Sequence, residues 1–146
     1  MLARYDDWFR QARRDLEHAE RSLESGDYEW ACFAAQQSAE KGVKALFLKA
    51  NRSAWGHSVG ALLQQLPASW QADESLVNAG KELDKHYIPP RYPNSHPQGA
   101  PYEYYTRSEA ERAIAHTTNI LSFCKRLLAR SGSNSDLSGA GSDTSG

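Results

Sequence analysis

Residues 87–105, YIPPRYPNSHPQGAPYEYY, hold the side chains of this sequence that are best suited to chemistry on a phosphate group. Four residues separate Arg91 from His96, in a stretch with five prolines and five tyrosines. A guanidinium grips a phosphate through two hydrogen bonds, and an imidazole of near-neutral pKa serves as base or acid. Cleavage of RNA without a metal needs such groups, because a proton must leave the 2′-hydroxyl and charge must be stabilised on phosphorus. Arg91 and His96 therefore have side chains that are able to hold a phosphate and to transfer a proton.

A second group of polar side chains belongs to an expected helix that precedes this stretch. Its members are Gln37, Glu40, Lys41 and Lys44. Glu40 and Lys44 stand four residues apart and form an ion pair on one helix face, worth about 0.3–0.5 kcal/mol if exposed. A solvated helix face is one interpretation of the two lysines. The other is that one lysine contacts a phosphate beside Arg91.

A nucleotide site in this chain would have to be built from side chains. No glycine-rich run precedes a helix and a lysine, so the usual phosphate loop is absent from the sequence. Basic side chains and aromatic stacking by Tyr87, Tyr92 or Tyr102 would have to replace it.

Arg91 also has a purely structural interpretation. Its guanidinium would bond Glu40 or Gln37 beneath the proline-rich stretch, because buried polar groups need partners. Tyr92 would then pack on the helices, and the Asn94 side chain would bond the backbone of the loop. This arrangement is compatible with binding, since a rigid loop over a polar pocket forms a pocket wall.

The remaining reactive side chains predict neither a metal site nor a cofactor. No Cys/His cluster has zinc spacing, and the distant Cys32 and Cys124 lie in apolar helical contexts, which favours buried free thiols over a disulfide. His57 begins a short helix, where capping or packing is the expected role. The four tryptophans are interpreted as core or dimer-interface residues.

The hydrophobic periodicity predicts an all-α fold, an antiparallel bundle of four to five helices. We expect helices over 4–25 and 27–50, with Gly26 ending the first and Asp27 capping the second. A short helix should start at Ser58 and stop at Pro67, and another should cover 73–87. Ser108, with Glu111 three residues on, predicts the capping box of the last helix. The helical domain covers 1–130, and the Ser/Gly-rich residues 131–146 are expected to be disordered.

Charge and hydropathy exclude several classes of protein. Lys and Arg number 17 and Asp and Glu 18, for a net charge of −1, which is not the basic footprint of a duplex-DNA binder. No run of about 18 apolar residues is present to span a membrane. The first residues, MLARYDDWF, lack the apolar core of a signal peptide. We therefore expect a cytoplasmic protein.

Three segments in order, FAAQQSAEKGVKALFL, GHSVGALLQQL and ELDKHYIPPRYPN, resemble the HEPN domain (higher eukaryotes and prokaryotes nucleotide-binding). The resemblance covers about residues 4–128 and is greatest for the small prokaryotic branch with an Arg-Tyr-Pro-Asp/Asn motif. It implies a helical bundle that forms symmetric dimers. It also implies a minimal nucleotidyltransferase as partner, often in a toxin–antitoxin pair.

The resemblance further implies metal-independent ribonuclease activity in many members. Their signature is an arginine, four to six residues, then a histidine, at a dimer groove where two copies meet. Arg91 and His96 have this spacing. This sequence departs from the signature in having Tyr92 after the arginine, two prolines that oppose a helix over 91–97, and Gln98 where well-marked toxins carry a tyrosine.

Three hypotheses follow. The first is a dimeric component of a two-component, toxin–antitoxin-like system that binds nucleotide or RNA through Gln37, Glu40, Lys41, Lys44, Tyr87, Arg91, Tyr92 and Asn94, with a nucleotidyltransferase-like partner. The second is an enzyme, a metal-independent endoribonuclease toxin that uses Arg91 and His96. The third is a non-catalytic protein–protein interaction module.

Overall fold

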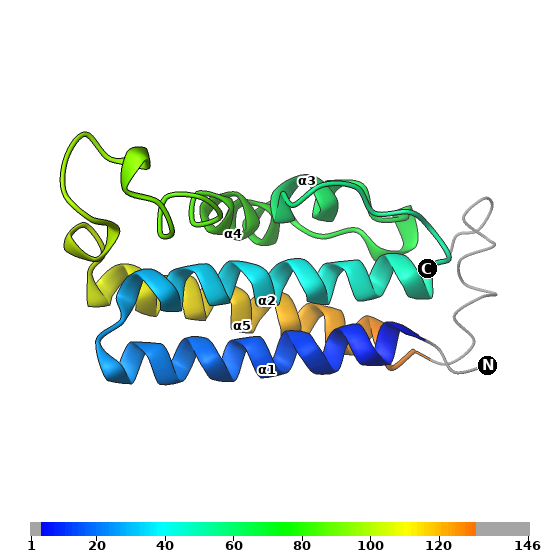
Figure 1. The fold of residues 1–146 in the computed structure, drawn as a ribbon. Helices are drawn as coiled ribbons and strands as arrows, with labels where there is room; N and C mark the ends of the chain where they lie inside the picture. Colours follow the sequence, from blue (N-terminus) through cyan, green and yellow to red (C-terminus); the bar gives the residue numbers. More distant parts are fainter. Residues whose placement is uncertain (1–3, 131–146) are drawn as a thin grey trace.

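The computed structural model describes residues 4–130 and contains five α-helices (Figure 1). They are α1 (Arg4–Ser25), α2 (Tyr28–Lys49), α3 (Val59–Gln64), α4 (Glu74–Asp84) and α5 (Arg107–Leu128). No strand occurs within residues 4–130, so the predicted all-α bundle is confirmed. The predicted tail, 131–146, lies outside the described residues.

Helix α2 lies in the middle of the bundle. In Figure 1, α1 runs antiparallel to α2 on one side, α3 and α4 cover the opposite side, and α5 lies behind. Most α2 side chains are consequently buried. Within residues 4–130, no helix is long and apolar enough to cross a membrane.

The turn between α1 and α2 shows one prediction confirmed and one wrong. Gly26 ends α1 in the left-handed conformation, with φ at 83°, which a glycine adopts without a steric penalty. The Asp27 backbone N–H then donates to the Ser22 carbonyl at 2.9 Å. Asp27 does precede α2, but its side chain makes no capping hydrogen bond, so the predicted cap is wrong. With φ at −91° and ψ at 70°, its backbone departs from the extended geometry typical of a capping residue.

Small side chains let α5 approach α2 closely. A Cβ placed on Gly42 would lie 2.4 Å from Leu121 Cδ2, so nothing larger than hydrogen fits there without movement. Beside this contact, the buried Thr117 hydroxyl donates to the Ala35 carbonyl at 2.7 Å. Close packing and this buried hydrogen bond together fix how α5 sits on α2.

Asp84, the last residue of α4, holds the start of α3. Its carboxylate accepts the backbone N–H groups of Val59 at 2.7 Å and Gly60 at 3.1 Å, and the Ser58 hydroxyl at 2.7 Å. Ser58 also accepts from Ala61 N at 3.1 Å, so the predicted cap of α3 is confirmed. The carboxylate satisfies backbone donors that a short helix leaves free, and it fixes the loop that precedes α3.

Two helix ends differ from prediction. Helix α4 ends at Asp84 rather than residue 87, because the following N–H groups bond carbonyls three residues back and Pro89 disfavours helix before it. The capping box of α5 is formed by Thr106 and Glu109, two residues earlier than the predicted Ser108 and Glu111. Both pairs have the same spacing, and sequence spacing alone does not choose between them.

The tryptophans differ in burial, whereas both cysteines are buried. Trp70 is in the core with 1% exposed, as predicted, whereas Trp55 is 81% and Trp30 45% exposed. Cys32 and Cys124 are both free and buried, so the predicted free thiols are confirmed. Burial raises the pKa of the Cys32 thiol to about 12, which leaves it protonated and unreactive near neutral pH.

Candidate functional site

The proline-rich segment 87–105 connects α4 to α5 at one end of the bundle, on the left in Figure 1. It contains two short 3-10 helices, Pro93–Ser95 and Pro101–Glu103, and no α-helix. The predicted absence of a regular helix over 91–97 is confirmed. The segment is mostly exposed, and its side chains divide into two groups with different partners.

Arg91 lies among three aromatic rings. Its Cζ atom is 4.4 Å from the ring centroid of Phe33 in α2, 4.9 Å from that of Tyr87 and 5.2 Å from that of Tyr92. Its Nε donates to the Tyr87 carbonyl at 2.9 Å. The rings stabilise the cation through their negative faces. They hold the guanidinium in place without neutralising its charge.

Glu40 does not bond Arg91, which corrects the structural interpretation of that arginine. The Glu40 carboxylate, 8% exposed, accepts from Lys44 Nζ at 2.9 Å and bonds His57 Nδ1 at 2.9 Å. Gln36 and Gln37 direct amide groups at the same carboxylate, at 3.4 and 3.5 Å. With four polar neighbours the carboxylate is satisfied, and it has no need of Arg91 as a further partner.

His57 is a member of this group that the sequence did not single out as functional. Of the two expected roles, capping is filled by Ser58 instead, whereas packing is confirmed, and the His57 ring in addition bonds Glu40. The ring also stacks on Tyr87, with centroids 4.7 Å apart and planes at 17°. Its backbone carbonyl accepts from Gln36 at 3.0 Å. The one signal for His57 in the sequence was its position in GHSVGALLQQL, the second of the three segments that carry the family resemblance.

The two lysines predicted for the site have different partners. Lys44 pairs with Glu40, whereas Lys41 Nζ pairs with Asp15 of α1 at 2.7 Å. Lys41 therefore faces α1, and Lys44 is neutralised by its partner. Neither lysine belongs to a solvated helix face, which was one of the two interpretations, because both side chains are half-buried.

His96 belongs to the other group of the segment. Its Nε2 lies 2.9 Å from the Pro89 carbonyl, and its ring stacks on Tyr104 with centroids 4.3 Å apart. Tyr105 approaches the His96 ring edge-on, with the two ring centroids 6.4 Å apart. The ring partners of His96 and those of Arg91 have no residue in common.

The other predicted residues of the segment are exposed. Asn94 lies in the first 3-10 helix, and no hydrogen bond of its side chain occurs among residues 4–130. Tyr92 is 47% exposed and lies against Arg91. Tyr102 is 67% exposed. These side chains face solvent, where they are accessible to a ligand.

Polar groups of α4, of the two residues that follow it and of α5 line a hollow of about 330 Å³. Burial lowers the pKa of His86, so this ring is held neutral. His116 bonds Glu82 at 2.8 Å, and this hydrogen bond lowers the pKa of the Glu82 carboxyl. Burial also raises the pKa of Tyr105, which packs edge-on against His86.

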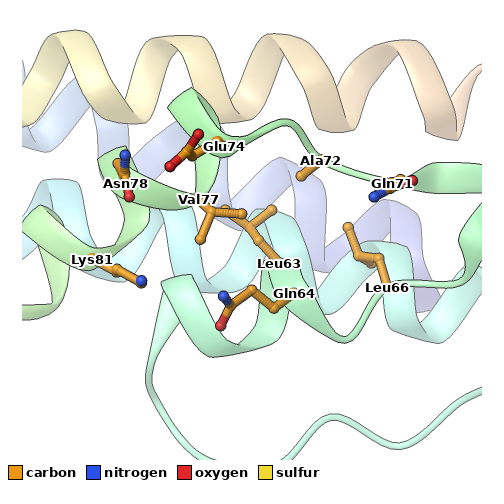
Figure 2. Close-up of a pocket in the computed structure, with 9 residues that line it drawn as sticks. All are labelled: Leu63, Gln64, Leu66, Gln71, Ala72, Glu74, Val77, Asn78 and Lys81. Carbon is orange, nitrogen blue, oxygen red and sulfur yellow. The ribbon is translucent and has the colours of Figure 1, made fainter.

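A further hollow, of about 430 Å³, lies beside α3 and α4 (Figure 2). Figure 2 shows the residues that line it, among them Leu63, Val77 and Lys81. None of the predicted site residues lines it. The candidate site is therefore the surface formed by Arg91, its aromatic neighbours and the Glu40–His57 pair, rather than this hollow.

Comparison with known proteins identifies the family. A curated protein of Methanocaldococcus jannaschii, named "Putative toxin MJ1304", is 26% identical over 130 residues, covering 83% of this chain and 86% of that protein. The crystal structure of TT1696 from Thermus thermophilus has a TM-score of 0.83 at 50% identity, covering 86% of this chain and 98% of that one. ST0689, described as an archaeal HEPN homologue, has a TM-score of 0.71 at 42% identity, with the same coverage. The model of the HEPN domain matches residues 5–127, and the chain belongs to the HEPN domain family.

Proposed function

We propose that this chain is the toxin-like component of a two-component system and binds single-stranded RNA or a nucleotide at the Arg91 surface. The likeness to a protein named as a toxin supports the general class. The observation that carries the binding proposal is the Arg91 guanidinium, a cation held by three aromatic rings.

The chemistry of this surface suits a nucleotide. Among residues 4–130, no carboxylate forms an ion pair with Arg91, so its charge remains available to a phosphate. Its terminal nitrogens are free to bond two phosphate oxygens, because Nε is the atom that bonds Tyr87. The exposed Tyr92 ring offers a face on which a base stacks.

The proposal includes a homodimer and a nucleotidyltransferase-like protein partner in the cytoplasm. Exposed apolar side chains on a single copy, among them Trp55, Leu48 and Trp30, support an interface of some kind. Light scattering at micromolar concentration tests the dimer. We expect twice the mass of one chain, and the mass of a single chain would reject that part.

The binding proposal is tested by fluorescence anisotropy with a labelled single-stranded RNA in the presence of chelator. We expect Arg91→Ala to weaken binding by about tenfold or more and Arg91→Lys to recover part of the loss. Arg13→Ala, which removes an exposed arginine of α1, is the matched control and should change little. Equal loss in the two alanine variants would mean nonspecific attraction, and no loss at Arg91 would reject the site.

A second candidate function is the metal-independent endoribonuclease that uses Arg91 and His96. It is favoured by the free charge of Arg91 and by the separation of four residues between the two side chains. In this function Arg91 holds the phosphate and His96 acts as acid or base. Incubation with RNA and chelator tests it, since equal cleavage by wild type, Arg91→Ala and His96→Ala would indicate a contaminant.

A further inference from the structure

We propose that His57, positioned by the buried carboxylate of Glu40, is the proton-transferring residue that acts with Arg91 on a phosphodiester. This inference rests on the proposed binding of RNA at the Arg91 surface. It assigns a residue outside the arginine–histidine pair found by sequence, and it gives His96 no part in proton transfer.

The pairing of Glu40 with His57 fixes the proton on the imidazole ring. A carboxylate accepts hydrogen bonds, so the contact at 2.9 Å places the proton of the neutral ring on Nδ1. Nε2 then carries the lone pair, which is the atom that takes up a proton. The same logic orients the histidine of a serine-protease triad, where a buried carboxylate sets tautomer and orientation.

Burial of one partner and exposure of the other suit this role. Glu40 is 8% exposed and His57 is 56% exposed, so the carboxylate is shielded while the ring reaches solvent. Lys44 and the two glutamines hold Glu40, and Gln36 also holds the His57 backbone carbonyl. The ring is therefore supported at its backbone, at Nδ1 and on the face that meets Tyr87.

Tyr87 joins His57 to Arg91. The His57 ring and the Arg91 guanidinium both lie on the Tyr87 ring, at 4.7 Å and 4.9 Å from its centroid. Tyr87 is therefore a common neighbour of the exposed imidazole and of the guanidinium that would bind the phosphate. His96 has no such link, because its contacts are Pro89, Tyr104 and Tyr105.

The step balances without a metal or redox partner. His57 Nε2 takes the proton of a ribose 2′-hydroxyl, and the 2′-oxygen forms a bond to phosphorus. The bond from phosphorus to the 5′-oxygen breaks, and that oxygen takes a proton from water. The protonated His57 then returns its proton to the hydroxide that the water leaves, which restores the neutral ring. The products are a 2′,3′-cyclic phosphate and a 5′-hydroxyl. Arg91 stabilises the negative charge that develops on the phosphate oxygens.

The experiment measures cleavage and binding of the same labelled single-stranded RNA, in chelator, by the full chain. His57→Asn is the main variant, because its amide still donates to Glu40 but accepts no proton. We expect cleavage to fall by about 100-fold, with RNA affinity changed less than about threefold. His18→Ala, which removes an exposed histidine of α1, is the control and should keep at least about half of the cleavage rate.

The outcomes separate this inference from the proposed function. Cleavage by His57→Asn at the wild-type rate overturns the inference, as does a loss of cleavage in His18→Ala as large as that in His57→Asn. Binding that depends on Arg91, with no cleavage by wild type, also overturns it but leaves the proposed function standing. Absence of Arg91-dependent binding rejects both.

A spectroscopic measurement tests Glu40 as a positioning residue. Nitrogen-15 NMR of the histidine rings should report the Nδ1–H tautomer for His57 in the wild type. In Glu40→Gln we expect that tautomer preference to be lost and cleavage to fall by at least about tenfold. An unchanged His57 tautomer in a folded Glu40→Gln variant would overturn the positioning role.

Discussion

Helix α2 and the segment 87–105 meet at the same site but are stabilised in opposite ways. In α2 the charged group is buried and saturated, since Glu40 bonds Lys44, His57 and nearby amides. In the segment the charged group is half-buried and held by aromatic faces, since Arg91 rests on Phe33, Tyr87 and Tyr92. The difference shows that the buried charge of α2 positions neighbouring side chains, whereas the segment presents to solvent an arginine that has no ionic partner among the described residues. Substitutions in α2 should therefore cost stability, and those in the segment should mainly cost binding.

The largest effect on stability is expected for Glu40→Ala. Removing this carboxylate leaves Lys44, 17% exposed, without its partner, and breaking a buried pair costs about 3 kcal/mol. Urea denaturation measures the free energy of unfolding. Glu111→Ala, which breaks an ion pair 57% and 54% exposed, is the matched control and should cost less than about 1 kcal/mol. Equal losses in the two variants would remove the contrast between buried and exposed charge.

Gly42→Ala should follow, with a loss of about 2 kcal/mol. The added Cβ would lie 2.4 Å from Leu121 Cδ2, so α2 and α5 would have to separate or repack. Thermal unfolding measures the effect. In a double-mutant cycle with Leu121→Ala the two losses should be less than additive, because the shortened side chain removes the clash. Strict additivity would place the cost of Gly42→Ala elsewhere.

Thr106→Ala tests the capping residue that directly follows the segment and precedes α5. It removes the side chain that accepts the Glu109 backbone N–H at 3.1 Å, and loss of such a cap costs about 1 kcal/mol. Ser108→Ala is the control, because the sequence predicted Ser108 as the cap and the structure places it inside α5. A larger loss from Ser108→Ala than from Thr106→Ala would favour the cap predicted from sequence.

The smallest effect on stability is expected for Asn94→Ala, below about 0.5 kcal/mol, because the side chain is exposed. RNA binding, measured by anisotropy, should weaken if Asn94 contacts the ligand as proposed. A loss of stability comparable with that of Gly42→Ala would show that the segment, like α2, is held by its own polar contacts.

The sequence was sufficient for the fold because local periodicity determines where these helices form. The first helix was predicted over 4–25 and is found at Arg4–Ser25. Helix ends were harder to predict, since Thr106 and Ser108 offer equally spaced capping boxes. The end of α4 depends on the balance between helical hydrogen bonds and Pro89, which periodicity does not include.

The site was less predictable because its contacts are distant in sequence. Spacing within α2 identified the pair of Glu40 and Lys44. It could not identify His57, 17 residues further on, as the second partner of Glu40. Nor could it foresee that Phe33 of α2 would meet Arg91 of the segment. Such contacts depend on how α3, α4 and the segment are placed over α2.

The most direct test of the central claim is to locate bound RNA on the protein. Photocrosslinking with single-stranded RNA that carries 4-thiouridine, followed by peptide mass spectrometry, makes that measurement. We predict crosslinks at Tyr87, Tyr92 or Phe33 that are lost in Arg91→Ala. Crosslinks confined to a distant surface, such as that of Trp55, and unchanged in Arg91→Ala would contradict the account.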